Sequence, residues 1–219
     1  MPRPGGGRLM QAGALRPYER ALLTADPLGM HAADGRVINL DIARWLGPVD
    51  GVDTTVVTRC VGPVLDVGCG PGRFVSALIE RGVAALGVDI AEAAVSLSRR
   101  RGLPAVLRNV FAPIPGEGRW PTVLLMDGNI GIGGDPDRLL RRSRTLLAPH
   151  GTLFVETHPD SCADETLTVR FRHDGAAVGP PFDWSHVGLV PLLRYAGVLG
   201  FGAPEVWTVG GRTFAAFPR

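Results

Sequence analysis

A glycine-rich turn after a short apolar run carries the clearest chemical signal in the chain. The stretch Val64–Phe74 reads VLDVGCGPGRF. Gly68, Gly70 and Gly72 allow a tight turn that a ligand can approach closely, and the helix predicted after the turn offers free N–H groups to an anionic group. Asp89 lies 17 residues after Gly72, where a carboxylate can accept hydrogen bonds from ribose hydroxyls. These residues predict a nucleotide-like ligand.

The spacing of the glycines narrows the class of ligand. A dinucleotide fingerprint, G-x-G-x-x-G, requires glycine at position 73, which is Arg73 here, and the spacing is G-x-G-x-G instead. Asp66 precedes the first glycine by two residues, where the dinucleotide fingerprint needs no acid. A Walker loop is excluded because no G-K-[ST] follows and the chain contains no Lys.

Polar residues follow two further apolar runs. Asp127 and Asn129 come after VLLM, and His158 comes after TLFVET. Ligands of open α/β sheets bind beyond the carboxyl ends of the strands, so we expect these side chains to face a second substrate. His158 is the first choice for a general base because an imidazole titrates near neutral pH, with a helix-capping or loop histidine as the alternative. Asp127 is the second catalytic candidate, and Asn129 is expected to position the substrate.

Aromatic and histidine side chains outside these strands supply further candidates. Tyr18, His31 and Trp184 are expected to contact the second substrate, although each also has an interpretation as a structural residue. His173 and His186 are interpreted as structural residues. The hypothesis therefore places substrate contacts in the N-terminal region and in the segment after the fifth predicted strand.

The decamer MDGNIGIGGD, Met126–Asp135, joins a predicted strand to a predicted helix. A calcium loop is excluded because the acids lack the required spacing and the closing Glu. A phosphate cradle is unsupported, since Gly68–Gly72 already fills that role. We expect the decamer's glycines to bring the backbone close to the ligands, as a floor for the site.

Alternating strands and helices must position these residues. Strands are expected at 64–67, 85–89, 104–107, 123–126 and 152–157, and helices at about 73–82, 91–101, 135–147 and 188–199. This alternation predicts a parallel sheet covered on both faces. Residues 1–60 are expected to form a tail and a helical lid, with helices near 17–24 and 38–47. Residues 158–187 read as an insert with a hairpin or loop at 167–184, and Gly210-Gly211 as a tight antiparallel hairpin.

At this point DVGCGPG followed by GVDI resembles class I S-adenosylmethionine-dependent methyltransferases, over about residues 60–157. The resemblance implies a Rossmann-like, doubly wound α/β fold in one domain, 1–219. Its seven-stranded sheet would be mostly parallel, with an antiparallel last strand and helices on both faces. It also implies S-adenosylmethionine as cofactor, S-adenosylhomocysteine as product and no metal.

The same resemblance implies roles for individual residues. Asp66 would lie near the amino group of the cofactor, Asp89 would hold the ribose diol and Ile90 would pack on the adenine. Asn109 replaces an acid that often binds the adenine amine in this family, and its amide oxygen can accept the same bond. The cofactor positions expected are Asp66, Gly68, Cys69, Gly70, Gly72, Asp89, Ile90, Asn109, Val110, Phe111, Asp127 and Asn129.

Composition bounds the class of protein. The 219 residues are 45% hydrophobic and 20% charged, with a net charge of +2, which is ordinary for a single globular domain. Abundant Gly and Pro with no Lys are typical of a GC-rich genome such as that of an actinobacterium. Arginine runs read as solvated helix faces, so we expect no nucleic-acid partner.

The remaining expectations concern location and assembly. No apolar run reaches the roughly 18–20 residues of a membrane span, and the N-terminus reads as a flexible tail without a signal peptide. Three cysteines without metal-ligand spacing suit a reducing cytoplasm. We expect a cytoplasmic monomer or homodimer.

Three functions are compatible with the sequence. The first is methylation of a small molecule, by O-, N- or C-transfer. The second is methylation of RNA or protein; DGNI stands where an N-P-P-Y-like motif would follow the fourth strand, which argues against methylation of base amines by that motif. The third is a non-methylating cofactor-binding protein such as a sensor, partner subunit or cyclase-like relative, since fold alone does not fix function.

Overall fold

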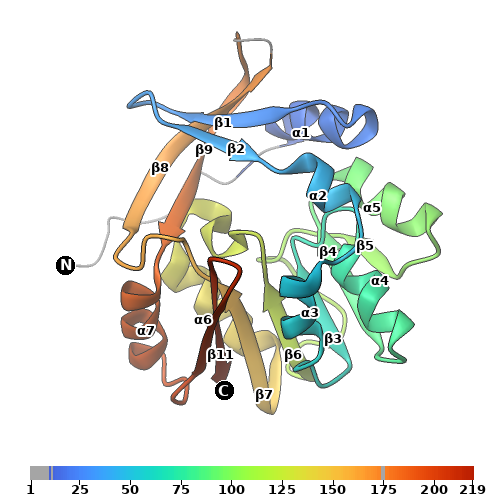
Figure 1. Ribbon diagram of the computed structural model, residues 1–219, viewed down its shortest axis with the longest axis vertical. Helices are drawn as coiled ribbons and strands as arrows, with labels where there is room; N and C mark the ends of the chain where they lie inside the picture. Colours follow the sequence, from blue (N-terminus) through green and yellow to red (C-terminus); the bar gives the residue numbers. More distant parts are fainter. Residues whose placement is uncertain (1–9, 11, 174–175) are drawn as a thin grey trace.

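The fold is built on a seven-stranded sheet with helices on both faces (Figure 1). The computed structural model describes residues 10, 12–173 and 176–219, so the first nine residues of the predicted tail lie outside the described part. In spatial order the strands are β10 (Glu205–Val209), β11 (Arg212–Pro218), β7 (Leu147–Glu156), β6 (Trp120–Leu125), β3 (Val64–Val67), β4 (Ala85–Asp89) and β5 (Ala105–Leu107).

Strand direction confirms the predicted fold class. The pairs from β7 through β6, β3 and β4 to β5 are parallel, whereas β11 is antiparallel to both β7 and β10. The turn between β10 and β11 falls at Gly210 and Gly211, as the sequence predicts, with φ of 57° and 75°. The first two predicted strands, 64–67 and 85–89, have the observed bounds.

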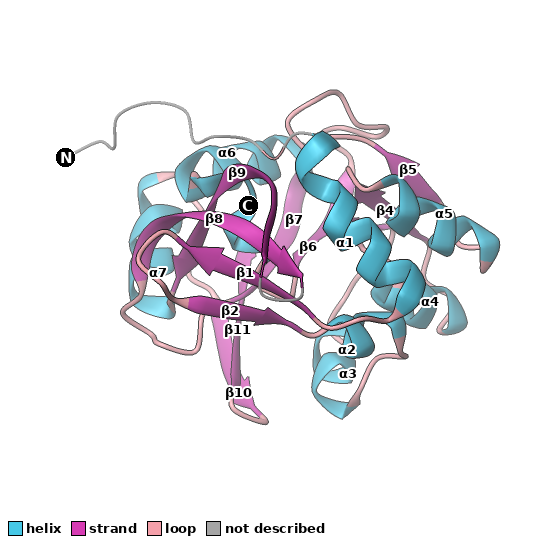
Figure 2. Cartoon of the chain, turned by 90° about the horizontal axis from the view of Figure 1, so that it is seen from above, coloured by secondary structure: helices cyan, strands magenta, loops and turns pink. Residues whose placement is uncertain are grey.

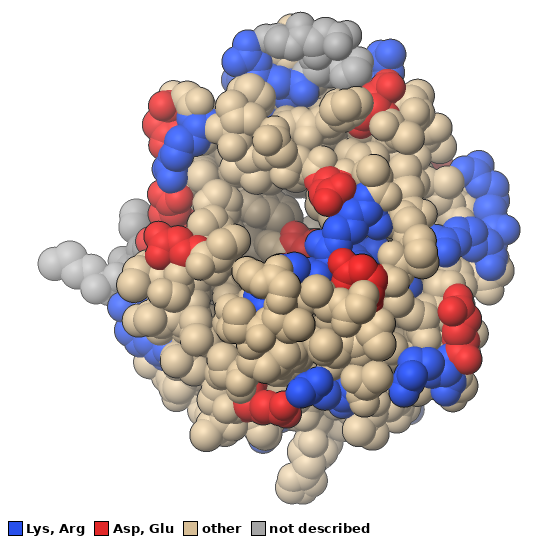
Figure 3. Space-filling view, in the orientation of Figure 1, with Lys and Arg blue, Asp and Glu red and all other residues tan. Residues whose placement is uncertain are grey.

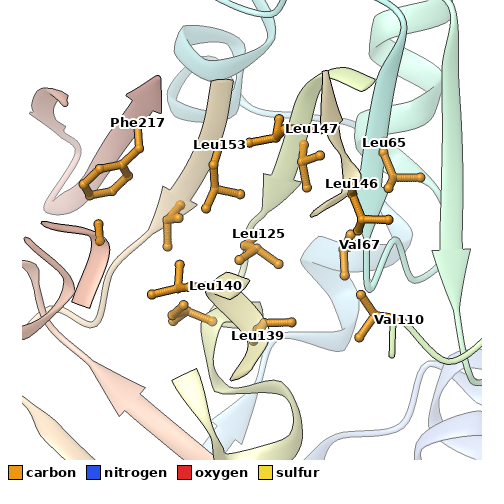
Figure 4. Close-up of a cluster of buried hydrophobic side chains, with 14 of the residues drawn as sticks. Leu65, Val67, Val110, Leu125, Leu139, Leu140, Leu146, Leu147, Leu153 and Phe217 are labelled. Carbon is orange, nitrogen blue, oxygen red and sulfur yellow. The ribbon is translucent and has the colours of Figure 1, made fainter. Parts of the chain in front are cut away.

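Two hydrophobic cores cover the two faces of this sheet. Along β6, Val123 and Leu125 belong to one cluster and Leu124 to the other, as alternation along a strand requires. The first cluster packs against α6 (Pro136–Leu146) and α7 (Leu189–Val198), and part of it is shown in Figure 4. The second packs against α3 (Gly51–Val57) and α4 (Arg73–Glu80). Another helix, α5 (Glu92–Arg100), contacts β4 and β5.

A second, four-stranded antiparallel sheet forms the lid over the site. Its order is β2 (Val37–Leu40), β1 (Leu28–Ala32), β8 (Asp164–His173) and β9 (Ala176–Val187). Figures 1 and 2 show this sheet and α1 (Ala12–Thr24) lying above the carboxyl ends of the core strands. The lid therefore joins the N-terminal region to the predicted insert through the pairing of β1 with β8.

The helical lid predicted from the sequence is in part wrong. Residues 37–40 form a strand, and the helix expected over 38–47 is reduced to α2 (Ile42–Leu46). Asp41 ends the strand and caps α2, because its carboxylate accepts a hydrogen bond from the Arg44 backbone N–H. The hairpin expected at 167–184 is present as the longer pair β8 and β9.

Candidate active site

One cavity of about 570 Å³ lies between the lid and the carboxyl ends of the core strands. Figure 3, in the orientation of Figure 1, shows a hollow near the middle of the molecule. Arginine and acidic side chains lie on one side of this hollow. The volume is within the range of small-molecule sites, roughly 300–1,000 Å³. Of the residues expected to contact ligands, the cavity is lined by Tyr18, Asp66, Gly68, Cys69, Gly70, Asp89, Ile90, Asn109, Val110, Phe111, Asp127, Asn129, His158 and Trp184.

The glycine turn has the strained backbone that its composition predicts. Gly68, Gly70 and Gly72 have φ of 71°, 53° and 87°, a left-handed region that side-chain-bearing residues rarely adopt. A Cβ at Gly68 would lie 2.6 Å from Nδ2 of Asn129, and one at Gly70 would lie 3.4 Å from the hydroxyl of Tyr18. Gly68 and Gly70 line the cavity. Gly72, which was also expected to contact the cofactor, is outside the lining and packs against Ser98 and Leu103.

Asp66 is a buried carboxyl group without a protein partner. Its side chain is 2% exposed and lines the cavity, and within the described ranges it makes no hydrogen bond. Burial, followed by the nearby charge of Asp127, raises the pKa of Asp66 to about 7, although Arg73 opposes the rise. A buried carboxylate without a donor is unfavourable, so the site favours a cationic ligand group here.

Asp89 ends β4 and ties the glycine turn to the neighbouring strand. Its Oδ2 accepts the backbone N–H of Gly70 at 2.9 Å, and its Oδ1 accepts that of Ala91 at 2.8 Å. Each carboxylate oxygen keeps a further lone pair. Burial is the largest effect on this group and raises the pKa of Asp89. The position suits acceptance of hydrogen bonds from a ribose diol.

The wall beyond Asp89 combines apolar and amide groups. Ile90, Val110 and Phe111 line the cavity with Asn109. The Asn109 Oδ1 already accepts the Phe111 backbone N–H at 2.9 Å, which leaves one lone pair of that oxygen and the amide N–H groups for a ligand. Val110 is 4% exposed and belongs also to the core. This wall has the chemistry of a purine pocket.

The decamer after β6 is attached to the glycine turn. Asn129 Nδ2 donates to the backbone oxygens of Val67 and Gly68 at 2.9 and 3.0 Å, so this amide positions the turn. Most of the decamer forms η1 (Asn129–Gly134), two 3₁₀ turns joined by a kink at Ile132 and Gly133. Its Gly131 lies against the lid, because a Cβ there would come within 2.5 Å of Nε1 of Trp184.

The glycines of the decamer therefore contact two different parts of the molecule, the cavity and the lid strand β9. Gly128 and Gly133 line the cavity, as expected, whereas Gly131 and Gly134 pack against β9. A Cβ at Gly134 would lie 2.5 Å from the Cβ of Asp183. The decamer is thus both a wall of the site and the seat of the lid strand, and the second role was missed from the sequence.

A buried ion-pair network under the cavity was also missed. Arg73, 3% exposed, donates to Oδ2 of Asp53 and, through Nη2, to both carboxylate oxygens of Asp127 at 2.7 Å. Asp127 has φ of 54°, and such strain in a residue other than glycine is often found at functional sites. Arg73, which occupies the position of the third glycine in a dinucleotide fingerprint, thus holds Asp127 in place after the end of β6.

Two further arginines complete the network. Arg212 on β11 donates to both oxygens of Glu156 at 2.7 Å and to Asp53 at 2.8 Å. Arg44 on α2 donates to Asp53 at 2.7 Å and to Asp127 at 3.2 Å. Burial, the largest effect, would raise the pKa of Asp53, but Arg212 and Arg73 bring it below its usual value. Burial, the largest effect, raises the pKa of Asp127, although Arg73 and Arg44 lower it. Both carboxylate oxygens of Asp127 accept hydrogen bonds from Arg73, which suits a positioning role.

The lid side of the cavity is aromatic. Tyr18 stacks on Phe171 with a centroid distance of 6.5 Å and meets Trp45 edge-on at 6.1 Å. The aromatic lid-side residues and the neighbouring methionine that line the cavity are Tyr18, Met30, Trp45, Phe171, Phe182 and Trp184, beside the aliphatic side chains of Leu15, Ile38 and Leu40. Of this set, the sequence indicated Tyr18, Trp184 and Phe182 as candidates, whereas Met30, Trp45 and Phe171 were missed. Alternation along β8 and β9 could have indicated that Phe171 and Phe182 face one side.

His31 is displaced from the predicted site. Its neighbour Met30 is 3% exposed and lines the cavity, while His31 is outside the lining and lies 3.5 Å from a guanidinium nitrogen of Arg172. Successive residues of a strand point to opposite faces, so β1 cannot direct both side chains into the site. The prediction that His31 contacts the substrate is therefore not supported by its position.

Two histidines stand together at the edge of the cavity. The rings of His158 and His186 stack with centroids 4.5 Å apart and an interplanar angle of 26°, and both line the cavity. His158 was the predicted base, whereas His186 was interpreted as structural. Within the part of the chain that is described, no group of three or more His, Cys, Asp or Glu residues has the arrangement of a metal site.

These features define a class of protein. A glycine turn after β3, an acid ending β4 and a lid over both are typical of a Rossmann-like cofactor-binding protein. The sequence matches the methyltransferase domain family over residues 56–185, and the chain belongs to that family.

Individual relatives agree with this membership. Over 101 residues the chain is 30% identical to the ubiquinone biosynthesis O-methyltransferase of Bordetella avium, which covers 43% of this chain and 42% of that protein. The chain thus matches less than half the length of that relative. Its fold is similar to a SAM-dependent methyltransferase from Bacteroides fragilis in complex with S-adenosyl-L-homocysteine, with TM-score 0.81, 21% identity and coverage of 97% and 98%.

A more distant structure with the same fold contains a bound small molecule. The 1,6-didemethyltoxoflavin-N1-methyltransferase of Burkholderia thailandensis, solved with 1,6-didemethyltoxoflavin and S-adenosylhomocysteine, has TM-score 0.52 and 17% identity, over 71% of this chain and 70% of that one. Together, these comparisons show that the chain belongs to the methyltransferase domain family and has the fold of S-adenosylmethionine-dependent methyltransferases.

The site fits the cofactor of this family. Asp66 offers an unpaired buried carboxyl group to an ammonium, Asp89 offers lone pairs to a diol, and the glycine turn is closed to side chains. Tyr18 makes no hydrogen bond within the described ranges and directs its hydroxyl toward Gly70, where a ligand group can accept from it. The donors and acceptors thus match an amino acid joined to a nucleoside.

Replacement of Gly68 by Ala is expected to lower cofactor affinity at least about tenfold. The positive φ would cost roughly 1–2 kcal/mol, and the new methyl group would displace Asn129 from the turn. Gly82→Ala is the matched control, because Gly82 has φ of 74° with nothing within 4 Å of its Cβ position. Calorimetric titration with S-adenosylhomocysteine measures both; equal affinities in the two variants would contradict the role of Asn129.

Proposed function

We propose that this enzyme methylates a planar, largely apolar small molecule on a hydroxyl or amino group. The observation that carries the proposal is the aromatic lid side of a cavity of about 570 Å³. Flat aromatic side chains such as Phe171 and Trp184 bury a planar acceptor and fix its orientation by stacking. A small acceptor fits under the lid together with the cofactor half of the same cavity.

The chain's own groups have three tasks in this reaction. When bound, the cofactor supplies an activated sulfonium methyl group for in-line displacement. Asp66, Asp89 and the glycine turn would hold it, and the lid side chains would orient the acceptor and exclude water, which is the main source of catalysis in such a transfer. The imidazoles of His158 and His186 lie where a proton leaving the acceptor can be taken up.

The relatives support this substrate class. The Bordetella avium protein is named for O-methylation in ubiquinone biosynthesis, and the Burkholderia thailandensis enzyme for N1-methylation of 1,6-didemethyltoxoflavin. For RNA or protein the lid is unfavourable, because it covers the strand ends that a macromolecule would have to reach. The histidine pair in the cavity favours an enzyme over a non-methylating sensor, because a sensor does not need a group that takes up a proton from an acceptor.

The experiment is a methyl-transfer assay with labelled S-adenosylmethionine. Acceptor panels of hydroxylated and aminated aromatics, such as catechol and 4-hydroxybenzoate, are compared with bulk RNA and an unfolded protein. We expect transfer to members of the aromatic panel and none to the macromolecules. Cofactor binding with transfer only to RNA or protein, or with no transfer to any acceptor, would reject the proposed substrate class.

A further inference from the structure

The stacked histidines separate two cavities. A second cavity lies outside the first, and four residues line both: Val37, Ile38, His158 and His186. Its remaining wall contains the charged residues Arg36, Asp160, Asp164 and Glu165, together with Ala163 and Leu167. The two imidazoles thus line the proposed acceptor cavity on one side and the outer cavity on the other.

The tautomer of His158 is fixed by its own loop. Its Nδ1 accepts the backbone N–H of Asp160 at 3.1 Å, and its backbone N–H donates to Val187 at 2.8 Å. A nitrogen that accepts a hydrogen bond carries no proton, so neutral His158 holds its proton on Nε2. The Nε2 of His158 is therefore a hydrogen-bond donor, which does not suit the role of base predicted from the sequence.

The opposite tautomer is fixed at His186. Its Nδ1 lies 3.4 Å from Oε1 of Glu165, its partner in the β8–β9 register. Hydrogen bonds from Arg36, at 2.6 and 2.9 Å, hold the pKa of Glu165 below its usual value. A carboxylate can only accept, so His186 Nδ1 must carry the proton that faces it. The lone pair of neutral His186 is then on Nε2.

We propose that Nε2 of His186 takes the proton from the methyl acceptor, with Glu165 and Arg36 as positioning residues and His158 as a donor to the acceptor. This assignment rests on the proposed function. As the acceptor is methylated, its O–H or N–H bond breaks, the bonding pair stays on the acceptor atom and the proton binds Nε2. The resulting imidazolium faces Glu165, and the proton leaves to water through the outer cavity.

Electrostatics keep this base neutral. Its side chain is 15% exposed, and burial, then the proximity of His158, lower the pKa of His186, while Glu165 raises it and Arg36 lowers it. A base with a pKa below its ordinary value is unprotonated at neutral pH. The arrangement resembles that of other histidine bases, in which a carboxylate bonded to one ring nitrogen orients the imidazole so that the other nitrogen can accept a proton.

The first test measures tautomers without any turnover. Long-range proton–nitrogen NMR of the full chain with ¹⁵N-labelled histidine, assigned with His158→Gln and His186→Gln, reports which ring nitrogen is protonated. At pH 8 we expect protonated Nδ1 in His186 and protonated Nε2 in His158. Glu165→Gln should lower the pKa of His186 and mix its tautomers, whereas Glu205→Gln, an exposed glutamate paired with Arg59, should change neither. A proton on His186 Nε2 in the wild type would overturn the assignment.

The second test measures transfer to catechol or to whichever panel phenol is methylated. His186→Gln should lower kcat about 100–10,000-fold with unchanged affinity for S-adenosylhomocysteine, and His158→Gln less than tenfold. At saturating S-adenosylmethionine, which removes the contribution of Asp66 to cofactor binding, kcat of the wild type should fall as pH drops below the ordinary imidazole pKa of about 6.5, and His186→Gln should lose this dependence. Full activity of His186→Gln, or a larger loss in His158→Gln, would refute the proposal. Correct tautomers in an enzyme that methylates no panel member would reject the acceptor class alone.

Discussion

Affinity for S-adenosylhomocysteine is expected to rise about 25-fold between pH 5.5 and pH 7.5. With a pKa of about 7 in the free enzyme, Asp66 is about 3% ionised at the lower pH and about 76% at the higher one. Only the ionised carboxylate pairs with the cofactor's ammonium, and apparent affinity scales with the competent fraction. Calorimetric titration across this range, in two buffers of different ionisation enthalpy, also measures the proton released.

Asp66→Asn separates this effect from folding. The variant should bind the cofactor about 100-fold more weakly at pH 7.5, because loss of a buried charge-assisted contact costs roughly 2–5 kcal/mol, and its affinity should no longer depend on pH through this group. Without cofactor it should melt at a higher temperature than wild type at pH 8. The variant is expected to be the more stable protein because folding raises the pKa of Asp66 to about 7. The stability that protonated Asp66 contributes to the wild type is therefore lost as pH rises through about 7 and this buried carboxyl group ionises.

Asp137→Asn, on the exposed face of α6, is the matched control and should leave affinity unchanged. A pH-independent affinity in the wild type, or a cofactor-free Asp66→Asn that melts lower at pH 8, would show that Asp66 has a protein partner in the folded state. Either result would remove the main reason to place the ammonium there.

The cofactor half of the site could be predicted because its signals are local in the sequence. Asp66 and the glycines occupy seven consecutive positions, and Asp89 ends the next strand. A parallel sheet brings the ends of neighbouring strands together at one edge. The hydrogen bond from Gly70 to Asp89 is therefore implied by the strand order alone.

The lid could not be predicted in the same way. Strand β2 has the exposure pattern of an edge strand and forms by pairing with β1, and β1 in turn pairs with β8, more than a hundred residues later. Strand propensity depends on such tertiary neighbours. Asp41 was an available signal, because an N-cap there starts the helix at Ile42 and excludes 38–40 from it.

Charge partners far apart in sequence explain why the buried network was missed. Asp53 is paired with Arg73, 20 residues away, and with Arg212, 159 residues away. Neither spacing is a helical or strand period. The same holds for His186, whose partner Glu165 is 21 residues away, whereas Asp160, which fixes the tautomer of His158, is only two residues away and was a local signal.

Replacement of Arg73 by Met is expected to lower the free energy of unfolding by about 3–5 kcal/mol, the usual cost of removing one partner from a buried ion pair. The variant leaves Asp127 without its two short hydrogen bonds and weakens the pairing of Asp53, which is 0% exposed. For a chain of this length the melting temperature should fall by roughly 2–4 °C for each kcal/mol. Urea unfolding followed by circular dichroism measures the change.

Two further variants of the same chain provide a control and a rescue for Arg73→Met. Arg141→Met removes an exposed partner of Asp137 and should change stability by less than about 1 kcal/mol. Adding Asp127→Asn to Arg73→Met should recover part of the loss, because the unpaired charge is then removed and asparagine tolerates the positive φ of 54°. Additive losses in the double variant would mean that Arg73 stabilises the fold by packing alone. The network would then have no part in holding the end of β6 against the cofactor site.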